Sequence, residues 1–154
     1  RYFETHEAEA SVSFCSPTGH EGVRLLDLLN NRSESLVDGD DPMFRDRGPS
    51  VCIRIDWPGY QSWSRQVPTR NFRNPPGPIT RAKLGKNVAK TVGRFITQTT
   101  LGGKQSVDGD WRVGKGGIEV KDLVLVRLDH LSQGSWQPRL RLVRPVPNDV
   151  SPSD

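Results

Sequence analysis

The residue types that most often carry chemistry are sparse in this chain. It holds two cysteines, Cys15 and Cys52, and three histidines, His6, His20 and His130. Neither cysteine sits in a nucleophile motif, no Gly-x-Ser-x-Gly occurs, and the five-residue step from Cys15 to His20 is no recognised dyad. The sequence therefore predicts that the protein is not an enzyme and has no catalytic residues.

Side chains that could hold metals or phosphates show no recognised spacing either. The cysteines and histidines lack the paired spacings of a zinc site. The acidic turns at 38–41 and 108–110 could offer carboxylates to calcium, but they lack the EF-hand spacing and its terminal Glu, so we interpret them as solvated turns. The glycine-rich stretches 102–105 and 114–117 lack the features of a phosphate loop. We expect no metal and no cofactor.

A long segment without acidic residues is the strongest signal in the sequence. From Trp57 to Val107, 51 residues contain no Asp or Glu but nine Lys and Arg, which gives the segment a charge of +9. The rest of the chain holds 13 basic and 18 acidic residues, a charge of −5, so the net charge of +4 conceals a split distribution. A split charge points to the kind of partner a protein meets rather than to its fold.

The candidate binding residues come from this segment. Four cations recur at helical spacing on the polar side of a predicted helix, and three more precede them near aromatic residues. A helix packed on a sheet normally exposes a charged face, but such a face usually mixes signs, whereas this one has no acid. The predicted binding set is Lys83, Lys86, Lys90, Arg94, Arg65, Arg70, Arg73, Trp57, Tyr60 and Trp63.

Two kinds of partner suit these residues. Separated cations contact phosphates and aromatic planes stack on bases, which suits single-stranded or non-specific nucleic-acid binding through segment 57–107. The same mixture suits an interface with an acidic protein surface or with another copy of the chain. Neither a recognition-helix pair nor an aromatic strand signature occurs. We therefore expect a non-enzymatic interaction module that binds a protein or self-assembles through the basic helix face, with nucleic-acid binding as the alternative.

The strands that must position these residues follow from alternating hydrophobicity. The clearest alternation, with Val51, Ile53 and Ile55 on one side, predicts a strand that Pro58-Gly59 connects to the next strand as a hairpin. The predicted strands cover residues 10–15, 50–56, 63–69, 122–129 and 136–143.

Two helices are predicted from apolar residues at helical spacing. The longer one covers 80–97 with Thr80 as its N-cap, and the shorter one covers 21–30. Gly85 falls on the apolar side of the longer helix, where a missing side chain would let it lie close to a sheet. The fold class is therefore α+β, a mainly antiparallel sheet with both helices packed on one face. The order of the elements is also similar to the β-grasp layout of ubiquitin-like domains.

The chain of 154 residues is predicted to form one domain. We expect the domain to cover 10–144, between a flexible segment at 1–9 and a disordered tail at 145–154. No apolar run approaches the roughly 18 residues of a membrane span, so we expect a soluble protein without membrane contact. The chain begins at Arg1 with neither an initiator Met nor an apolar signal region, which indicates a processed product or a piece of a longer protein.

The two cysteines bear on the compartment. Both lie in short apolar stretches, and we interpret them as buried free thiols on strands, with a single disulfide as the alternative. Two cysteines do not form a disulfide framework, which favours an intracellular location in the cytoplasm or nucleus.

Three stretches together carry a resemblance to known sequences. They are Trp57-Pro58-Gly59-Tyr60 at the end of Ile53–Tyr60, Gly77-Pro78-Ile79-Thr80-Arg81-Ala82-Lys83-Leu84, and Gly134-Ser135-Trp136-Gln137-Pro138. In this order they resemble a family of uncharacterised proteins of mushroom-forming (basidiomycete) fungi, over roughly residues 50–143. The resemblance implies a fungal origin and carries over no catalytic residue.

Overall fold

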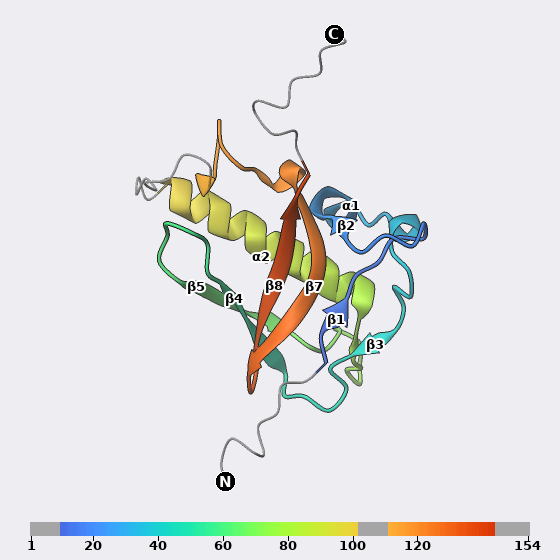
Figure 1. The fold of residues 1–154 in the computed structure, drawn as a ribbon. Helices are drawn as coiled ribbons and strands as arrows, with labels where there is room; N and C mark the ends of the chain where they lie inside the picture. The colour runs from blue at the N-terminus through green and yellow to red at the C-terminus, as the bar shows by residue number, and fades with distance from the viewer. Residues whose placement is uncertain (1–9, 102–110, 144–154) are drawn as a thin grey trace.

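A computed structural model describes residues 10–101 and 111–143 of the chain. The predicted flexible segment 1–9 and tail 145–154 lie outside these residues, as do the stretches 102–105 and 108–110. The structure is a six-stranded sheet with a long helix across one face, together with a small two-stranded sheet, which confirms the predicted α+β class (Figure 1).

The sheet is built from two long hairpins. Strands β4 (Ser50–Ile55) and β5 (Trp63–Pro68) form the first, and β7 (Leu123–Ser132) and β8 (Ser135–Leu142) form the second. The strand order is β1-β7-β8-β4-β5, where β1 is Val12–Ser13, and the short β2 (Val23–Arg24) also pairs with β7. Strands β4 and β8 run parallel at the centre, and the other ladders of this sheet are antiparallel. Hairpin, helix and hairpin with a parallel central pair is the order of the β-grasp layout.

The first hairpin matches its predicted bounds closely. Val51, Ile53 and Ile55 are buried while Arg54 is exposed, which is the alternation of a strand with one covered face. The register pairs Ile53 with Arg65 and Ile55 with Trp63, so these side chains share the helix-covered face.

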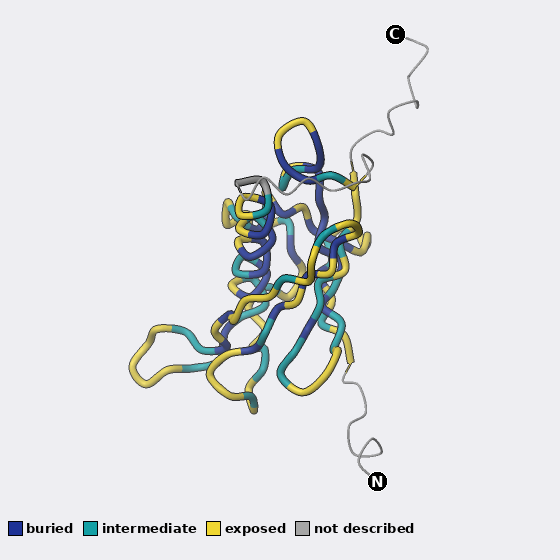
Figure 2. The backbone as a smooth tube through the Cα atoms, turned by 90° about the vertical axis from the view of Figure 1, so that its left-hand side faces the viewer, coloured by how far each residue is buried: buried dark blue, intermediate teal, exposed yellow. Residues whose placement is uncertain are grey.

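The long helix α2 (Arg81–Leu101) begins where the sequence predicts and continues four residues further. The Thr80 hydroxyl accepts the N–H of Lys83 at 3.1 Å, which confirms Thr80 as the residue that caps the helix start. The apolar side of α2 is buried against the sheet, and Figure 2 shows the buried residues of the helix by colour. Buried members of this side are Leu84, Val88, Ala89, Val92, Phe95 and Ile96.

The shorter helix is much shorter than predicted. α1 covers only Leu25–Leu29, because the chain before it pairs with β7 as β2 and forms a bridge between Cys15 and Glu21. Gly22 explains the change: it has a φ of +106°, and a Cβ there would lie 2.4 Å from a methyl of Val124. A helical path through Gly22 is therefore excluded by its place against β7.

The region 31–49, for which the sequence predicted no helix or strand, contains two short elements. A 3-10 turn, η2, covers Ser33–Ser35, and β3 (Pro42–Met43) pairs antiparallel with β6 (Ile79–Thr80) just before α2. A second 3-10 turn, η4 (Val120–Asp122), leads into β7. The small β3–β6 sheet holds the start of α2 against the rest of the domain.

Both cysteines are free thiols and half-buried, Cys15 at a bridge and Cys52 on β4. The predicted free state is confirmed, although neither side chain is fully buried. In the described parts of the chain, no helix is both long and apolar enough to cross a membrane.

Candidate functional site

Four cations lie along one side of α2 and form what we call the cation stripe: Lys83, Lys86, Lys90 and Arg94. Lys83, Lys90 and Arg94 are exposed and Lys86 is half-buried. Steps of three and four residues place them on one side of the helix, opposite the buried side chains. Within residues 10–101 and 111–143, none of the four makes an ion pair.

The cation stripe is unfavourable for the helix that carries it. Like charges three or four residues apart repel, at about 0.2–0.5 kcal/mol for each pair. The first turn of α2 has no acidic residue and contains Lys83, so charge there also opposes the helix dipole. Helix stability therefore does not explain why these four positions are all basic.

At the start of α2, the acid-free segment 57–107 lies next to acidic residues from another part of the chain. The guanidinium of Arg81 donates to the carbonyls of Ser13 and Asp38 and lies 3.4 Å from a carboxylate oxygen of Asp41. Its side chain is only 17% exposed, so Arg81 joins α2 to the chain before β3. Lys83 lines a depression of about 250 Å³ together with Asp27. The stripe is thus bordered by acids at its first turn.

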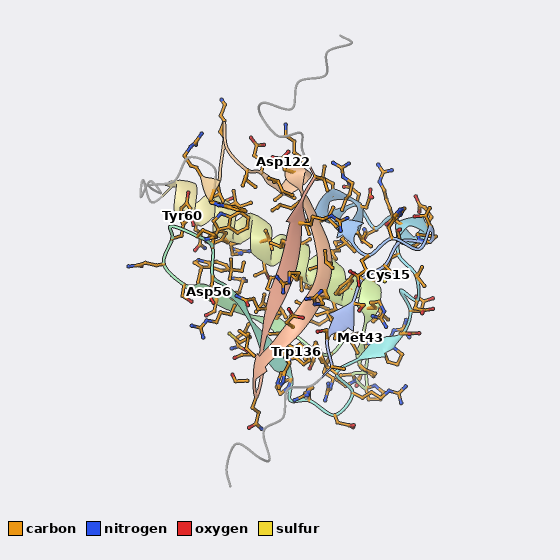
Figure 3. The ribbon with its side chains drawn as sticks, in the orientation of Figure 1. Cys15, Met43, Asp56, Tyr60, Asp122 and Trp136 are labelled. Atoms are coloured by element: carbon orange, nitrogen blue, oxygen red, sulfur yellow. The ribbon has the colours of Figure 1, made fainter. Side chains whose placement is uncertain are left out.

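The three aromatic residues of the predicted binding set pack on the helix. Trp57, Tyr60 and Trp63 surround Phe95, with ring centroids 6.0, 6.0 and 5.8 Å from it. Trp57 is 8% exposed and donates from its indole nitrogen to the carbonyl of Trp111 at 2.6 Å. The Pro58-Gly59 turn folds these rings over the C-terminal half of α2, near Tyr60 in Figure 3, where Trp57 is buried and Tyr60 and Trp63 are half-buried.

Their polar atoms are also engaged. The Tyr60 hydroxyl accepts the N–H of Val113 at 3.1 Å, and the Trp63 indole donates to the Gln98 side chain at 3.2 Å. Large amphipathic rings at the edge of a core satisfy their polar ends in this way. These aromatic residues close the core, and stacking on a base is not available to Trp57.

The three arginines predicted before the helix have different roles. The Arg70 guanidinium donates to the carbonyls of Arg47 at 2.6 Å and Phe44 at 3.4 Å, which gives this half-buried arginine a structural role. Arg65 on β5 and Arg73 in the following loop are exposed.

Phe72 is more exposed than the other exposed aromatic residue of the described chain, Trp111, which is 41% exposed. The Phe72 side chain is 94% exposed, in a loop that the Asn71 side chain closes by accepting the N–H groups of Arg73 and Gly77 at 3.0 and 2.9 Å. Asn71 also donates its own N–H to the carbonyl of Gly77 at 2.9 Å. The loop therefore holds an exposed ring next to the Arg73 cation.

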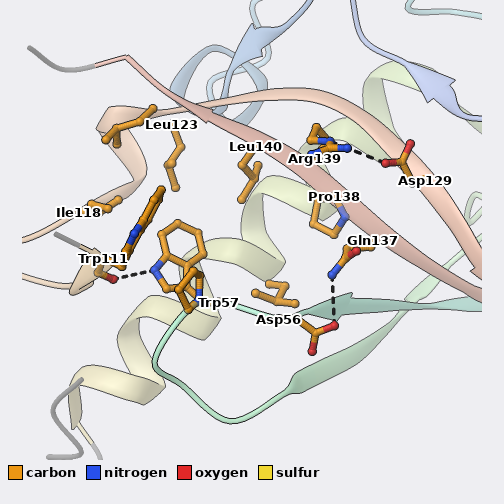
Figure 4. Close-up of a pocket in the computed structure, with 13 residues that line it drawn as sticks. Asp56, Trp57, Trp111, Ile118, Leu123, Asp129, Gln137, Pro138, Arg139 and Leu140 are labelled. Carbon is orange, nitrogen blue, oxygen red and sulfur yellow. Dashed lines mark hydrogen bonds and ion pairs between the residues drawn. The ribbon is translucent and has the colours of Figure 1, made fainter. Parts of the chain in front are cut away.

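A second candidate site lies where the two central strands separate. β4 and β8 pair only through Cys52–Ser135 and Ile53–Trp136, after which they diverge (Figure 1). A cleft of about 400 Å³ opens between their diverging ends, shown in Figure 4. Its apolar lining includes Ile55, Trp57, Trp111, Ile118, Leu123 and Leu140, and its polar lining is Asp56, Asp129, Gln137 and Arg139.

The carboxylates of the cleft are already paired. Asp56 lies 3.4 Å from Arg54 and accepts from the Gln137 amide at 3.2 Å. Burial raises the pKa of Asp129, but hydrogen bonds from Ser11 and Arg127, together with the charges of Arg127 and Arg139, outweigh burial and lower this pKa below its usual value of 3.8. Both carboxylates therefore hold arginines at the edge of the cleft.

The chemistry that the cleft could perform is limited by its lining. Among the 13 described residues around it, the ionisable side chains are Asp56, Asp129 and Arg139, and no His, Cys, Ser, Lys or Tyr is present. His130 packs on Trp136 instead, with ring centroids 4.7 Å apart. Among the residues placed by the structure, no group of three His, Cys, Asp or Glu is arranged to hold a metal ion. The cleft offers binding of a small or narrow apolar group.

Sequence reasoning missed the cleft altogether. Its walls come from the ends of β4 and β8, from the start of β7 and from the region 111–118, which are far apart in the sequence. The one local sign of the cleft was Asp56, which follows the alternating run of β4. This residue does not indicate that β8 pairs parallel with β4.

Comparisons of the chain with known protein families, with curated proteins and with solved structures found no match.

Proposed function

We propose that the chain is a non-enzymatic interaction module that binds an acidic protein surface through the cation stripe. The observation that carries this proposal is four cations on three turns of one helix with no ion pair in the described part of the chain. Each like-charge pair costs about 0.2–0.5 kcal/mol of helix stability, and an acidic partner would remove that cost.

A protein surface suits the site better than single-stranded nucleic acid. Sequence-tolerant binding of single strands uses aromatic planes beside a basic groove. Trp57, Tyr60 and Trp63 pack on Phe95, which leaves Phe72 as the exposed ring of the segment. Nucleic-acid binding through phosphates alone remains the alternative, and it is separated from protein binding by the choice of probe below.

Another copy of the chain could supply the acidic surface. Exposed carboxylates gather in the stretch that precedes β4, at Glu34, Asp38, Asp40, Asp41 and Asp46. These lie away from the C-terminal half of the stripe, so a contact between the two would be head-to-tail. Self-association is therefore measured alongside the binding of an added polyanion.

The test compares two double variants with the same change in net charge. Lys86→Gln/Lys90→Gln neutralises the middle of the stripe, and Arg54→Gln/Arg139→Gln neutralises two exposed arginines whose strand positions place them on the sheet face opposite α2. The probe is fluorescein-labelled poly-L-glutamate, with a mixed-sequence single-stranded oligonucleotide of similar length as the second probe. Fluorescence anisotropy at low salt should show polyglutamate binding that weakens about fivefold in the first variant only, from about 0.5 kcal/mol for each exposed ion pair.

Two outcomes would overturn the proposal. One is no polyglutamate binding at low salt, or equal weakening by both double variants. The other is much tighter binding of the oligonucleotide that is lost in Lys86→Gln/Lys90→Gln, which would favour the nucleic-acid alternative. Sedimentation of the protein alone over a range of concentrations shows whether the partner is a second copy.

A further inference from the structure

The outer edge of β5 has backbone groups that no other strand uses. In the sheet that the structure describes, β5 pairs with β4 and with no strand on its other side. The N–H of Thr69 donates to the carbonyl of Pro49 at 2.9 Å, in register with the pairs from Ser50–Pro68 to Ile55–Trp63. Hydrogen-bonded pairs alternate along an antiparallel ladder, so Ser64, Gln66 and Pro68 point their backbone groups away from β4.

These outward groups form a short template for another strand. Ser64 and Gln66 each offer an N–H and a carbonyl, and Pro68 offers a carbonyl without an N–H. All three residues are exposed. An extended segment that adds here would gain two donors and up to three acceptors, which is how sheet edges capture peptides.

A second copy of β5 is a poor occupant of this edge. Arg65 stands near the middle of the strand, so an antiparallel pair of two β5 strands would bring two arginines close together. Pro68 also removes one donor from the edge. Charge and proline at an edge are the devices that prevent sheets from joining edge to edge.

The cations beside the edge select an acidic segment. Arg65 is exposed and lies on the face of β5 shared with Trp63. The Trp63 indole contacts Gln98, and Arg94 is one helical turn before Gln98 on α2. Arg65 from the sheet and Arg94 from the cation stripe therefore lie on the two elements that the Trp63 side chain joins.

We propose that the acidic partner docks as an extended segment that adds to the free edge of β5. Its backbone would bond with Ser64 and Gln66, and its carboxylates would lie near Arg65 and Arg94. This inference rests on the proposed function and names the form of the partner.

The experiment uses a labelled synthetic peptide of alternating valine and glutamate, and a second peptide in which proline replaces every valine and each glutamate carries a methyl group on its backbone nitrogen. The two peptides carry the same charge, but the second has no N–H group on either edge of its repeating part and cannot form a ladder. The variant Gln66→Pro removes the outward N–H at the edge, and it spares the ladder to β4 because residues 65 and 67 make those bonds. The native Pro68 on the same side is a precedent for proline there.

The expected result is tighter binding of the valine peptide than of the proline peptide, and a loss of about three- to tenfold for the valine peptide in Gln66→Pro. Polyglutamate binding through the stripe should not change in this variant. In the wild-type protein, hydrogen exchange should show added protection of the Ser64 and Gln66 amides with the valine peptide, while the Arg65 and Val67 amides keep theirs.

Equal affinities for the two peptides, or no new protection at Ser64 and Gln66, would overturn the strand addition even if polyglutamate still bound. Conversely, if the wild-type protein does not bind polyglutamate at all, the proposed function itself is overturned. Because the exchange measurement uses the wild-type protein, the inference is tested even if Gln66→Pro fails to fold.

Discussion

Asp129 has a charge state that the structure ties to its neighbours. Ser11 donates to its carboxylate at 2.6 Å and Arg127 at 2.7 Å, and Arg139 lies 3.8 Å away. Burial raises the pKa of Asp129, and these partners outweigh that effect and lower it below 3.8. A lowered pKa in the folded state stabilises the fold above the unfolded pKa, and this contribution is lost as the pH falls through the folded value.

We therefore predict that Asp129→Asn lowers the free energy of unfolding at neutral pH and has less effect at a pH below the folded pKa. Urea unfolding at a series of pH values measures this difference. Asp46→Asn is the control, since Asp46 is exposed and makes no ion pair among the described residues. A destabilisation of Asp129→Asn that is the same at both pH extremes would contradict the prediction.

Arg70 and Arg73 provide a matched pair of arginines from one loop. Arg70 donates to two backbone carbonyls at 2.6 and 3.4 Å, whereas Arg73 is exposed. Arg70→Ala removes two hydrogen bonds from a charged donor to these carbonyls. It should therefore lower the free energy of unfolding by about 1–3 kcal/mol. Arg73→Ala should change it by less than about 0.5 kcal/mol, as measured by chemical denaturation. Equal effects would show that Arg70 is not the structural arginine.

At the residue scale, the sequence predicted charge better than exposure. Periodicity placed the cation stripe correctly on the polar side of α2. The angular position of a residue around the helix axis decides whether its side chain is exposed or buried, and this position follows from the sequence spacing. Periodicity did not show that Trp57 is buried, since the burial of a ring after a Pro-Gly turn depends on which element the turn folds onto. It did not show the hydrogen bonds of Arg70 for the same reason, because the carbonyl partners come from the distant 44–47 region.

Replacing glycine by alanine is expected to have opposite effects on stability at two positions in α2. A Cβ at Gly85 would lie 3.0 Å from Leu28 and 3.0 Å from Phe14, both buried, whereas a Cβ at Gly93 would meet Val120 at an ordinary 3.6 Å. Alanine improves helix propensity by up to about 1 kcal/mol at either site, but overpacking at Gly85 costs about 1–3 kcal/mol. Gly93→Ala should therefore stabilise the protein and Gly85→Ala should destabilise it, in denaturation measurements under the same conditions. Stabilisation by both would show that the contact of α2 with α1 can relax.

The cation stripe predicts a conflict between stability and binding in α2. Lys90→Glu would replace two repulsions, with Lys86 and Arg94, by two attractions, and should raise the free energy of unfolding by about 1 kcal/mol. The same variant should weaken polyglutamate binding. Thermal unfolding and anisotropy on one preparation measure both effects. A variant that is less stable, or that binds as well as wild type, would contradict the role assigned to the stripe.

At the element scale, local sequence patterns predicted the strands and the helix that bury a single face. The β4–β5 hairpin, the start of α2 at Thr80, and β7 and β8 all follow from alternation, spacing and capping. The 21–30 helix was predicted too long because its first residues pair with β7, an interaction of distant residues. The expectation that Gly85 allows close approach holds, but the approach is to Phe14 and Leu28 rather than to the sheet.

For the whole molecule, the parallel contact of β4 with β8 is the feature that local patterns could not supply. It consists of two register pairs, and it creates both the central order of the sheet and the cleft beyond Ile53 and Trp136. The fold class could be predicted because hairpins and a helix restrict how a sheet can be covered. The cleft could not, because it depends on where two strands separate.

The charge distribution of the whole molecule also differs from that of the sequence. The acid-free segment is bordered in space by Asp38 and Asp41 at Arg81, while the stripe beyond the first turn has no ion pair in the described residues. The binding claim therefore concerns Lys86, Lys90 and Arg94 more than the segment as a whole.

The salt dependence of polyglutamate binding tests that claim most directly. Affinity measured at several salt concentrations should fall with salt in the wild type, with a clearly shallower slope in Lys86→Gln/Lys90→Gln, because fewer cations meet the probe. The control Arg54→Gln/Arg139→Gln, on the sheet face opposite α2, should keep the wild-type slope. If both double variants show the same slope, the stripe is not the binding surface and the central claim is wrong.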